Sequence, residues 1–179
     1  MTSLTEFVSN AIEKLFFRSA IVAESKALAG HFREVTLTGE GLKSVSWIPG
    51  QKVQFHLGNL VARTYTPMAW DAAAGMARFL FFLHGNGPGA EWTARLKPGD
   101  ACQLLGPRDS LGFTGIKTPA LFFGDETSIA AAQALRSTQG NEETRFFLEV
   151  SSLVESEEVL RCLDLPDAGS FKNCRTAPI

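Results

Sequence analysis

The stretch FLFFLHGNGPGAEW, residues 79–92, combines three local signals in immediate succession. Its first part, Phe79 to Leu83, is the longest purely apolar run of the chain and is typical of a buried β-strand. A glycine-rich segment follows from His84, and Ala90 to Leu96 is expected to form a short helix. Because free N–H groups point outward from a helix N-terminus, this order of elements favours a phosphate site. The alternative is a tight loop in which glycine supplies only backbone freedom.

Gly85, Gly87 and Ala90 also match the G-x-G-x-x-G/A fingerprint of dinucleotide-binding folds. We do not assign that fold here. The strand before the loop belongs to a β-rich block, and no second parallel strand ending in an acidic residue follows at the required distance. Pro88 also lies inside the loop. The phosphate interpretation stands without the fingerprint.

Short β-type runs surround this stretch, separated by glycine and proline turns. These runs are Ile21–Ala27, His31–Thr38, Lys52–Leu57, Ala77–His84 and Cys102–Leu105. Many short strands at close spacing predict an antiparallel β-barrel, six-stranded or similar, over about residues 18–115. Ahead of it, apolar residues recur at helical spacing and predict an amphipathic helix over residues 4–17.

The pattern changes after Pro119. An apolar run at 120–123, a helical stretch at 126–137, a strand at 145–150 and a second helix at 156–163 follow one another. Strand and helix in alternation predict the start of a parallel α/β layer. Only two strands are evident, and 166–179 shows no period. We therefore expect two domains: 1–115, a β-barrel with an N-terminal helix, and 116–179, a partial α/β unit.

The composition is that of a globular protein. Of 179 residues, 45% are hydrophobic and 20% charged, and the net charge of −2 gives no sign of a nucleic-acid-binding surface. The three cysteines, Cys102, Cys162 and Cys174, form no CxxC pair and predict a reducing, cytoplasmic location. The first ten residues lack the basic region of a signal peptide, and no apolar run approaches the roughly 20 residues of a membrane span. Neither His31 nor His56 has partners at metal-ligand spacing, so no metal is predicted.

The segment Arg63-Thr64-Tyr65-Thr66-Pro67 is a candidate binding segment at the end of a strand. An arginine fork suits a phosphate, and a tyrosine ring suits stacking on a flat ligand. Tyr65 is the only tyrosine of the chain. The alternative is a strand with an exposed arginine and a core tyrosine.

Gly124-Asp125-Glu126-Thr127-Ser128 is a second candidate, directly after the first strand of the α/β unit. Ligands of open α/β sheets bind at the carboxyl ends of strands. Hydroxyls and amides at the start of the next helix could hold a phosphate or a ribose. The alternative is a capping turn with Asp125 as the N-cap.

In this order along the chain, the motifs resemble the siderophore-interacting proteins, which are FAD-binding ferric-siderophore reductases of the ferredoxin-reductase-like superfamily. The matching motifs are Pro49-Gly50-Gln51, the Arg63–Pro67 segment, the His84-Gly-x-Gly-Pro loop with Trp92, Pro98-Gly99-Asp100, Gly106-Pro107 and Gly124–Thr127. The resemblance implies an FAD-binding β-barrel followed by an α/β domain for the electron donor.

The resemblance also implies roles for individual residues. Arg63 would meet the FAD pyrophosphate, and Tyr65 would stack on the isoalloxazine. Thr66 would hydrogen-bond near the reactive edge of the isoalloxazine. Thr64, in the same segment, would also contact the cofactor. The pyrophosphate and adenosine side would be wrapped by His84, Gly85, Gly87, Pro88, Gly89 and Ala90, with Trp92 packed behind. The nicotinamide nucleotide would be faced by Gly124, Asp125, Glu126 and Thr127.

The chain departs from the family pattern at three places. Met68 stands where the family often has a second arginine, and Gly89-Ala90-Glu91 replaces the Ala-Ser-x of the family's glycine loop. Residues 151–179 do not resemble the family's longer second domain.

The expected function is reduction of a ferric siderophore through bound FAD, with electrons from NADH, NADPH or reduced ferredoxin. Flavin chemistry needs no acid or base for this step, so no catalytic side chain is predicted. A non-enzymatic flavin-binding module and a general flavin reductase or diaphorase are the alternatives. The oligomeric state stays open, although an incomplete sheet can self-associate.

Overall fold

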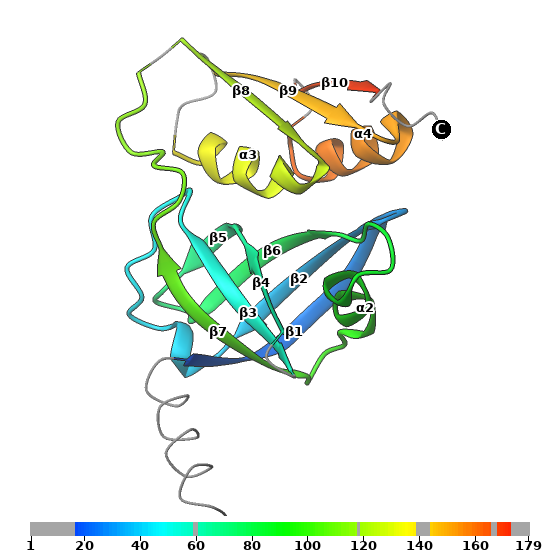
Figure 1. The fold of residues 1–179 in the computed structure, drawn as a ribbon. Coiled ribbons are helices and arrows are strands. Elements are labelled where there is room, and N and C mark those ends of the chain that lie inside the picture. The colour runs from blue at the N-terminus through cyan, green and yellow to red at the C-terminus, as the bar shows by residue number, and fades with distance from the viewer. Residues whose placement is uncertain (1–16, 59–60, 118, 139–143, 166–167, 173–179) are drawn as a thin grey trace, which may run out of the picture.

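A computed structural model describes residues 17–58, 61–117, 119–138, 144–165 and 168–172. It contains a seven-stranded antiparallel sheet and a three-stranded parallel sheet (Figure 1). The first part holds β1 (Phe17–Ala29), β2 (Phe32–Thr38), η1 (Glu40–Leu42), β3 (Lys52–Gly58), β4 (Val61–Tyr65), β5 (Pro67–Asp71), β6 (Met76–Phe82), α2 (Pro88–Arg95) and β7 (Ala101–Arg108). The helix predicted over 4–17 lies outside the described residues, except that Phe17 opens β1.

The seven-stranded sheet has the order β4-β3-β7-β1-β2-β6-β5. Its two edge strands, β4 and β5, are separated in the chain only by Thr66, so the sheet must curl until its edges approach each other. The expected closed barrel is wrong in this respect: the sheet is open, with no ladder between β4 and β5 among the described residues. Pro67, the first residue of β5, has no N–H to donate at this junction.

Strand alternation fills the inside of the curled sheet with large side chains. Val53, Phe55, Phe79, Phe81 and Leu104 are all at most 1% exposed. Phe55 and Phe79 meet edge to face, with ring centroids 5.0 Å apart. This aromatic cluster is the core of the first part of the molecule.

The second part holds β8 (Ala120–Asp125), η2 (Glu126–Ser128), α3 (Ile129–Arg136), β9 (Thr144–Val150), α4 (Leu153–Cys162) and β10 (Gly169–Lys172). The sheet order is β10-β9-β8, and all pairs are parallel. β10 was not predicted, because GSFK is too short to show a period. Figure 1 shows α3 and α4 lying between the two sheets. The boundary near residue 115 falls between β7 and β8; the assignment of the parts as separate domains stays a prediction.

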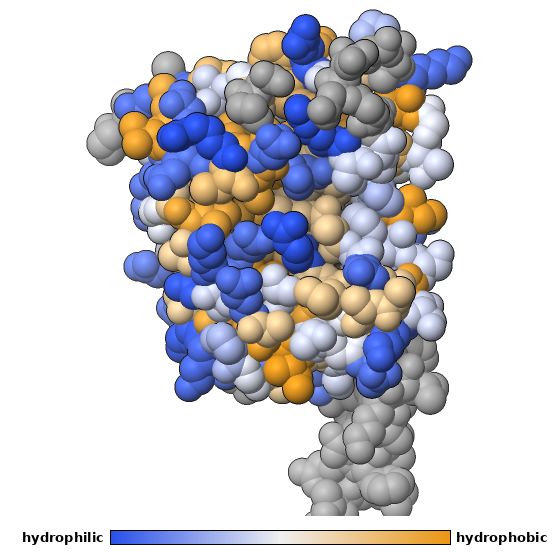
Figure 2. All heavy atoms as spheres, turned by 180° about the vertical axis from the view of Figure 1, so that it is seen from behind, coloured by the Kyte–Doolittle hydropathy of each residue, from blue (hydrophilic) through white to orange (hydrophobic). Residues whose placement is uncertain are grey.

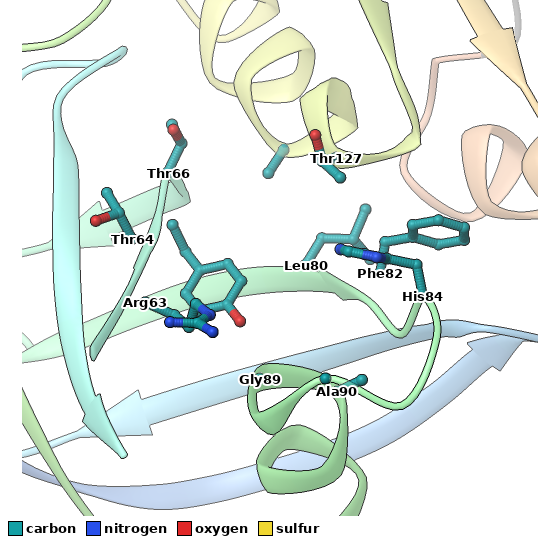
Figure 3. A pocket seen from close by; sticks show the side chains of 12 residues that line it. Arg63, Thr64, Thr66, Leu80, Phe82, His84, Gly89, Ala90 and Thr127 are labelled. Carbon is teal, nitrogen blue, oxygen red and sulfur yellow. The ribbon is translucent and has the colours of Figure 1, made fainter. Parts of the chain in front are cut away.

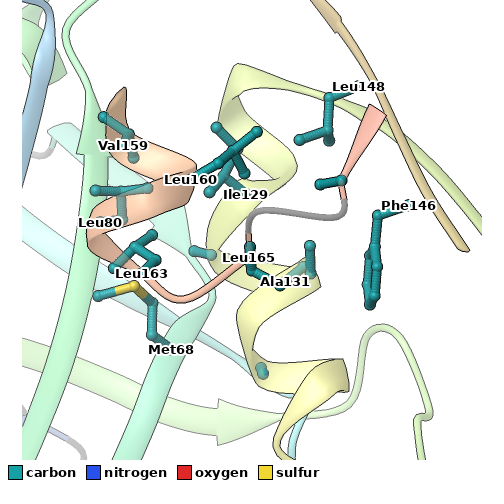
Figure 4. Packing of buried hydrophobic residues seen from close by; sticks show 14 of the residues in the cluster. Met68, Leu80, Ile129, Ala131, Phe146, Leu148, Val159, Leu160, Leu163 and Leu165 are labelled. Atoms are coloured by element: carbon teal, nitrogen blue, oxygen red, sulfur yellow. The ribbon is translucent and has the colours of Figure 1, made fainter. Parts of the chain in front are cut away.

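One hydrophobic cluster joins the two parts. Met68 on β5 and Leu80 on β6 point away from the inner core and pack with Ile129 of α3 and with Leu160 and Leu163 of α4 (Figure 4). The run Phe79 to Leu83 is apolar throughout because β6 is covered on both faces. Hydrophobic and hydrophilic side chains mix over the rear surface of both parts (Figure 2). No helix among the described residues is long and apolar enough to cross a membrane.

A polar contact also bridges the two parts. Oε2 of Glu155, on α4, accepts a hydrogen bond from the backbone N–H of His31 at 3.2 Å and lies 3.0 Å from its ring Nδ1. The Glu155 carboxylate lies directly over Gly30, at φ +42°, where a Cβ would come within 2.1 Å of it. The contact therefore requires glycine at the β1–β2 turn.

Replacing Met68 by arginine tests the apolar junction. Met68 is 2% exposed. We expect Met68→Arg to lower the free energy of unfolding by about 3 kcal/mol, because a charge would be buried without a partner. Met68→Leu is the matched control and should cost less than about 1.5 kcal/mol. Urea unfolding followed by circular dichroism measures both. Equal stability of the two variants would contradict the packing described here.

Acid unfolding tests the contact between Glu155 and His31. Hydrogen bonds from the His31 ring and backbone hold the pKa of Glu155 below its usual 4.5. The stabilisation is therefore complete above about pH 4.5 and is lost as the pH falls through the lowered pKa of the folded state. Glu155→Gln should be less stable than the wild type above this window, and the gap should close below it. Glu158→Gln, at an exposed position of α4, should show no such gap.

Candidate functional site

A pocket of about 400 Å³ opens where the edge of the seven-stranded sheet meets the α/β part. This size falls within the range of small-molecule sites. Figure 3 shows side chains from both parts around it. The pocket is lined by Arg63, Thr64, Tyr65, Thr66, Leu80, Phe82, His84, Gly87, Gly89, Ala90, Thr127 and Ala130.

Both predicted motifs of the β part reach this pocket. The edge strand β4 and Thr66 supply one wall, and the glycine loop with the start of α2 supplies another. The structure thus brings together segments that lie some twenty residues apart in the sequence. Residues of the predicted set that do not line the pocket are Gly85, Pro88, Trp92, Gly124, Asp125 and Glu126.

Tyr65 is held from behind by the aromatic core. Its ring meets Phe81 edge to face, with centroids 4.5 Å apart, and Phe55 at 5.7 Å. Burial raises the pKa of the Tyr65 hydroxyl above its usual 10.0, so the phenol is neutral at physiological pH. The ring is a fixed, uncharged surface at the pocket wall. Trp92 packs on Phe55 at 5.4 Å and lies behind this wall rather than in it.

The beginning of α2 lies against Tyr65 and Arg63. A Cβ on Gly89 would approach the Tyr65 hydroxyl oxygen to 2.9 Å and the Arg63 Cγ to 3.4 Å, so this approach requires glycine. The N-cap is Gly87, which offers no side-chain cap, and the first helical residue is Pro88. The N–H groups of the first turn have no carbonyl partner within their own helix. Arg63 and these N–H groups together make this corner favourable for an anion.

The opposite side of the pocket comes from the α/β part, through Thr127 and Ala130. Asp125 organises this turn as the N-cap of η2. Its Oδ1 accepts hydrogen bonds from the Thr127 backbone N–H at 2.9 Å and from the Thr127 hydroxyl at 2.6 Å. Glu126 accepts hydrogen bonds from the backbone N–H and hydroxyl of Ser151, which follows β9. The two acids brace the ends of β8 and β9, which agrees with the capping alternative for Asp125.

Sequence reasoning missed Leu80, Phe82 and Ala130 as lining residues. A signal was present for the first two: an uninterrupted apolar strand has a second buried face that needs a partner. His84 stacks on Phe82, with ring centroids 5.9 Å apart, at the exposed end of the pocket. Ala130 gave no signal, because its role depends on where α3 docks.

A metal site and a reactive thiol are the other kinds of chemistry to consider in the described part of the chain. It contains no group of three or more His, Cys, Asp or Glu residues placed to hold a metal ion. Cys102 and Cys162 are both free thiols. Burial, with a smaller effect of Asp100, raises the pKa of Cys102 to about 11, so this thiol is unreactive.

Comparison with known proteins finds a family similar to the segment that supplies most of this pocket. Residues 56–111 match the model of the siderophore-interacting FAD-binding domain. This segment is similar to that family. It includes the Arg63–Thr66 wall and the loop that leads into α2. The predicted resemblance is confirmed.

Two curated proteins are similar to this chain. An NADPH-dependent ferric-chelate reductase of Escherichia coli is 30% identical over 56% of this chain and 35% of its own length. The ferric vibriobactin reductase ViuB of Vibrio cholerae is 24% identical over 85% of this chain and 65% of its own length. The chain therefore spans between about a third and two thirds of the curated relatives it matches.

Solved structures agree on the fold. A siderophore utilization protein from T. fusca superposes with a TM-score of 0.74 at 23% identity, over 91% of this chain and 70% of that one. The ferredoxin reductase of carbazole 1,9a-dioxygenase gives a TM-score of 0.71 at 17% identity, over 90% of this chain and 53% of that one. The predicted fold class, an antiparallel β part followed by a ferredoxin-reductase-like α/β part, is confirmed, with an open sheet in place of the closed barrel.

The environment of Tyr65 can be tested directly, because it is the only tyrosine. We expect the ultraviolet absorbance of the phenolate to rise with a midpoint above pH 10.0, since burial disfavours the charged form. Circular dichroism over the same range checks that the protein stays folded. A midpoint at or below 10.0 in the folded protein would contradict the packed position of this ring.

Proposed function

We propose that the chain is a flavoprotein reductase that binds FAD in this pocket and reduces a ferric siderophore, releasing iron as Fe(II). The single observation that carries the proposal is the convergence of Arg63, Tyr65 and the N-terminus of α2 on one pocket. This convergence occurs within a segment that matches a siderophore-interacting FAD-binding domain. The names of the relatives, a ferric-chelate reductase and a ferric vibriobactin reductase, support the choice of substrate class.

The residues present fit FAD. The anion-favouring corner suits a pyrophosphate: Arg63 would bind it together with the N–H groups of Gly89 and Ala90. The neutral, rigid ring of Tyr65 would support the flat isoalloxazine, and the hydroxyls of Thr64 and Thr66 would hydrogen-bond to its polar edge. When bound, FAD supplies the redox chemistry, accepting two electrons and passing them singly to iron.

The remaining predicted residues would hold the ends of the cofactor and the electron donor. His84, Gly85, Gly87 and Pro88 would wrap the adenosine side, with Trp92 fixing the wall behind Tyr65. The electron donor would be NADPH, NADH or reduced ferredoxin. A nicotinamide nucleotide would approach the Gly124–Thr127 turn, where Thr127 offers a hydroxyl to the pocket and Asp125 and Glu126 hold the turn in place. A cytoplasmic location fits the free thiols of Cys102 and Cys162.

Binding of FAD to site variants tests the proposal. We expect Arg63→Ala to weaken FAD binding by about tenfold to a hundredfold, because a charge-assisted pair to the pyrophosphate is lost. Tyr65→Ala should weaken binding to a similar degree, whereas Tyr65→Phe, which keeps the ring, should bind nearly as well as the wild type. Arg95→Ala, an arginine exposed at the far end of the same helix, is the matched control and should leave binding unchanged.

Flavin fluorescence during titration gives the affinities, and a ferrous-specific chelator reports Fe(II) released from a ferric siderophore. Unchanged FAD affinity in Arg63→Ala and Tyr65→Ala would contradict the site. FAD binding without reduction of the ferric siderophore by NADPH, NADH or reduced ferredoxin would leave a flavin-binding module. Faster reduction of free flavin or quinone than of the siderophore would leave a general flavin reductase.

A further inference from the structure

The outer face of the three-stranded sheet carries an apolar patch that the proposed function does not use. In Figure 1 both helices, α3 and α4, lie on the inner side of this sheet. On the opposite side, alternate residues of the three strands expose large apolar side chains. The exposed fractions are 66% for Leu121, 67% for Phe123, 36% for Phe147 and 47% for Phe171. We call these four residues the outer patch.

Strand register gathers the outer patch into one surface. Phe123 on β8 pairs with Phe147 on β9, and their rings stack with centroids 5.2 Å apart and an angle of 17° between them. Leu121 lies two residues before Phe123 on the same face. Phe171, on β10, pairs with Glu149, two residues beyond Phe147. Parallel sheets are ordinarily covered on both faces, and a contiguous apolar patch of this kind marks an interaction surface.

The charges at the two ends of the outer patch are opposite. Arg145 pairs with Leu121 at the beginning of β9, and Glu149 pairs with Asp125 near the end of the same strand. By strand alternation, Arg145 and Glu149 lie on the same face as Phe147. The patch is thus positive at one end, aromatic in the middle and negative at the other end.

We propose that the outer patch binds a second copy of this chain. A two-fold axis that lies between the two copies, parallel to the sheet and perpendicular to its strands, reverses the strand direction of the partner. It places the aromatic centre of one copy on that of the other and Arg145 over Glu149 of the partner subunit, twice by symmetry. Such an isologous arrangement satisfies both ends of the patch at once.

The size of the patch predicts a weak dimer. Its four side chains offer on the order of 400 Å² of apolar surface, counting about 200 Å² for a whole aromatic side chain. Standard interfaces bury about 800 Å² per partner. We therefore expect reversible dimerisation with a dissociation constant in the micromolar range.

Charge reversal combined with sedimentation equilibrium tests the pairing. The wild type should dimerise with rising concentration, and Phe123→Ser should stay monomeric while keeping its circular dichroism spectrum. Arg145→Glu and Glu149→Arg should each weaken self-association by at least about tenfold, because each places like charges opposite each other. The double variant Arg145→Glu/Glu149→Arg should dimerise like the wild type. Arg95→Glu, which reverses an exposed charge on α2, is the matched control and should dimerise like the wild type.

Mixing the two single variants tests whether these two charged positions lie in the interface. Arg145→Glu and Glu149→Arg should form a heterodimer although neither forms a stable homodimer, since both cross-contacts are then between opposite charges. Together with dimerisation of the wild type and of the double variant, which a parallel packing would not allow because it sets like charges opposite each other in both, this result would support the proposed axis. A wild type that is monomeric throughout, as expected if a different polypeptide covers the patch, would overturn the proposal. Single variants that associate as strongly as the wild type, or a mixture that stays monomeric, would overturn it as well.

Discussion

The burial of β6 on both faces is the constraint on which the rest of the molecule depends. Phe79 and Phe81 point into the curled sheet, and Leu80 points out against α3 and α4. The same strand is therefore part of two cores. Because the outward face can be buried only by the α/β part, this strand fixes how the two parts meet. The pocket lies along this junction and takes its walls from both parts.

The pocket depends on the close approach of two backbone segments, the end of β4 and the start of α2. The sheet is open at the step from β4 to β5, and Tyr65 lies at this step with the Phe81 ring behind it. Gly89 lets the first turn of α2 lie directly against the tyrosine. Across the pocket, the Asp125 carboxylate accepts a hydrogen bond from the Thr127 backbone N–H and so stabilises the turn on which Thr127 lies. Arg63 and Tyr65 of β4 thus meet the start of α2, some twenty residues later in the sequence, and together they form the anion-favouring corner and the flat aromatic side.

Local chemistry was predictable from the sequence, and tertiary consequences were not. The Arg63–Thr66 segment and the glycine loop stand out by residue type, and the structure gathers most of both around one pocket. The sequence pattern indicates only that Met68 replaces an arginine of the family, whereas in the structure Met68 is buried beneath the α/β part and could not carry a charge there. β5 and β10 are too short to show a period, and their pairing depends on partners elsewhere in the chain. The spacing of short strands predicts a barrel but does not show whether the two edge strands join, so the open edge between β4 and β5 is visible only in the structure.

The central claim is that the pocket between the two parts holds FAD. The most direct measurement is the visible absorption spectrum of the purified protein, followed by that of the supernatant after denaturation. We expect a flavin spectrum in the native protein, either as isolated or after addition of FAD, and release of intact FAD on unfolding. A colourless protein that takes up no added FAD would contradict the account, leaving a fold shared with the reductases but without their cofactor.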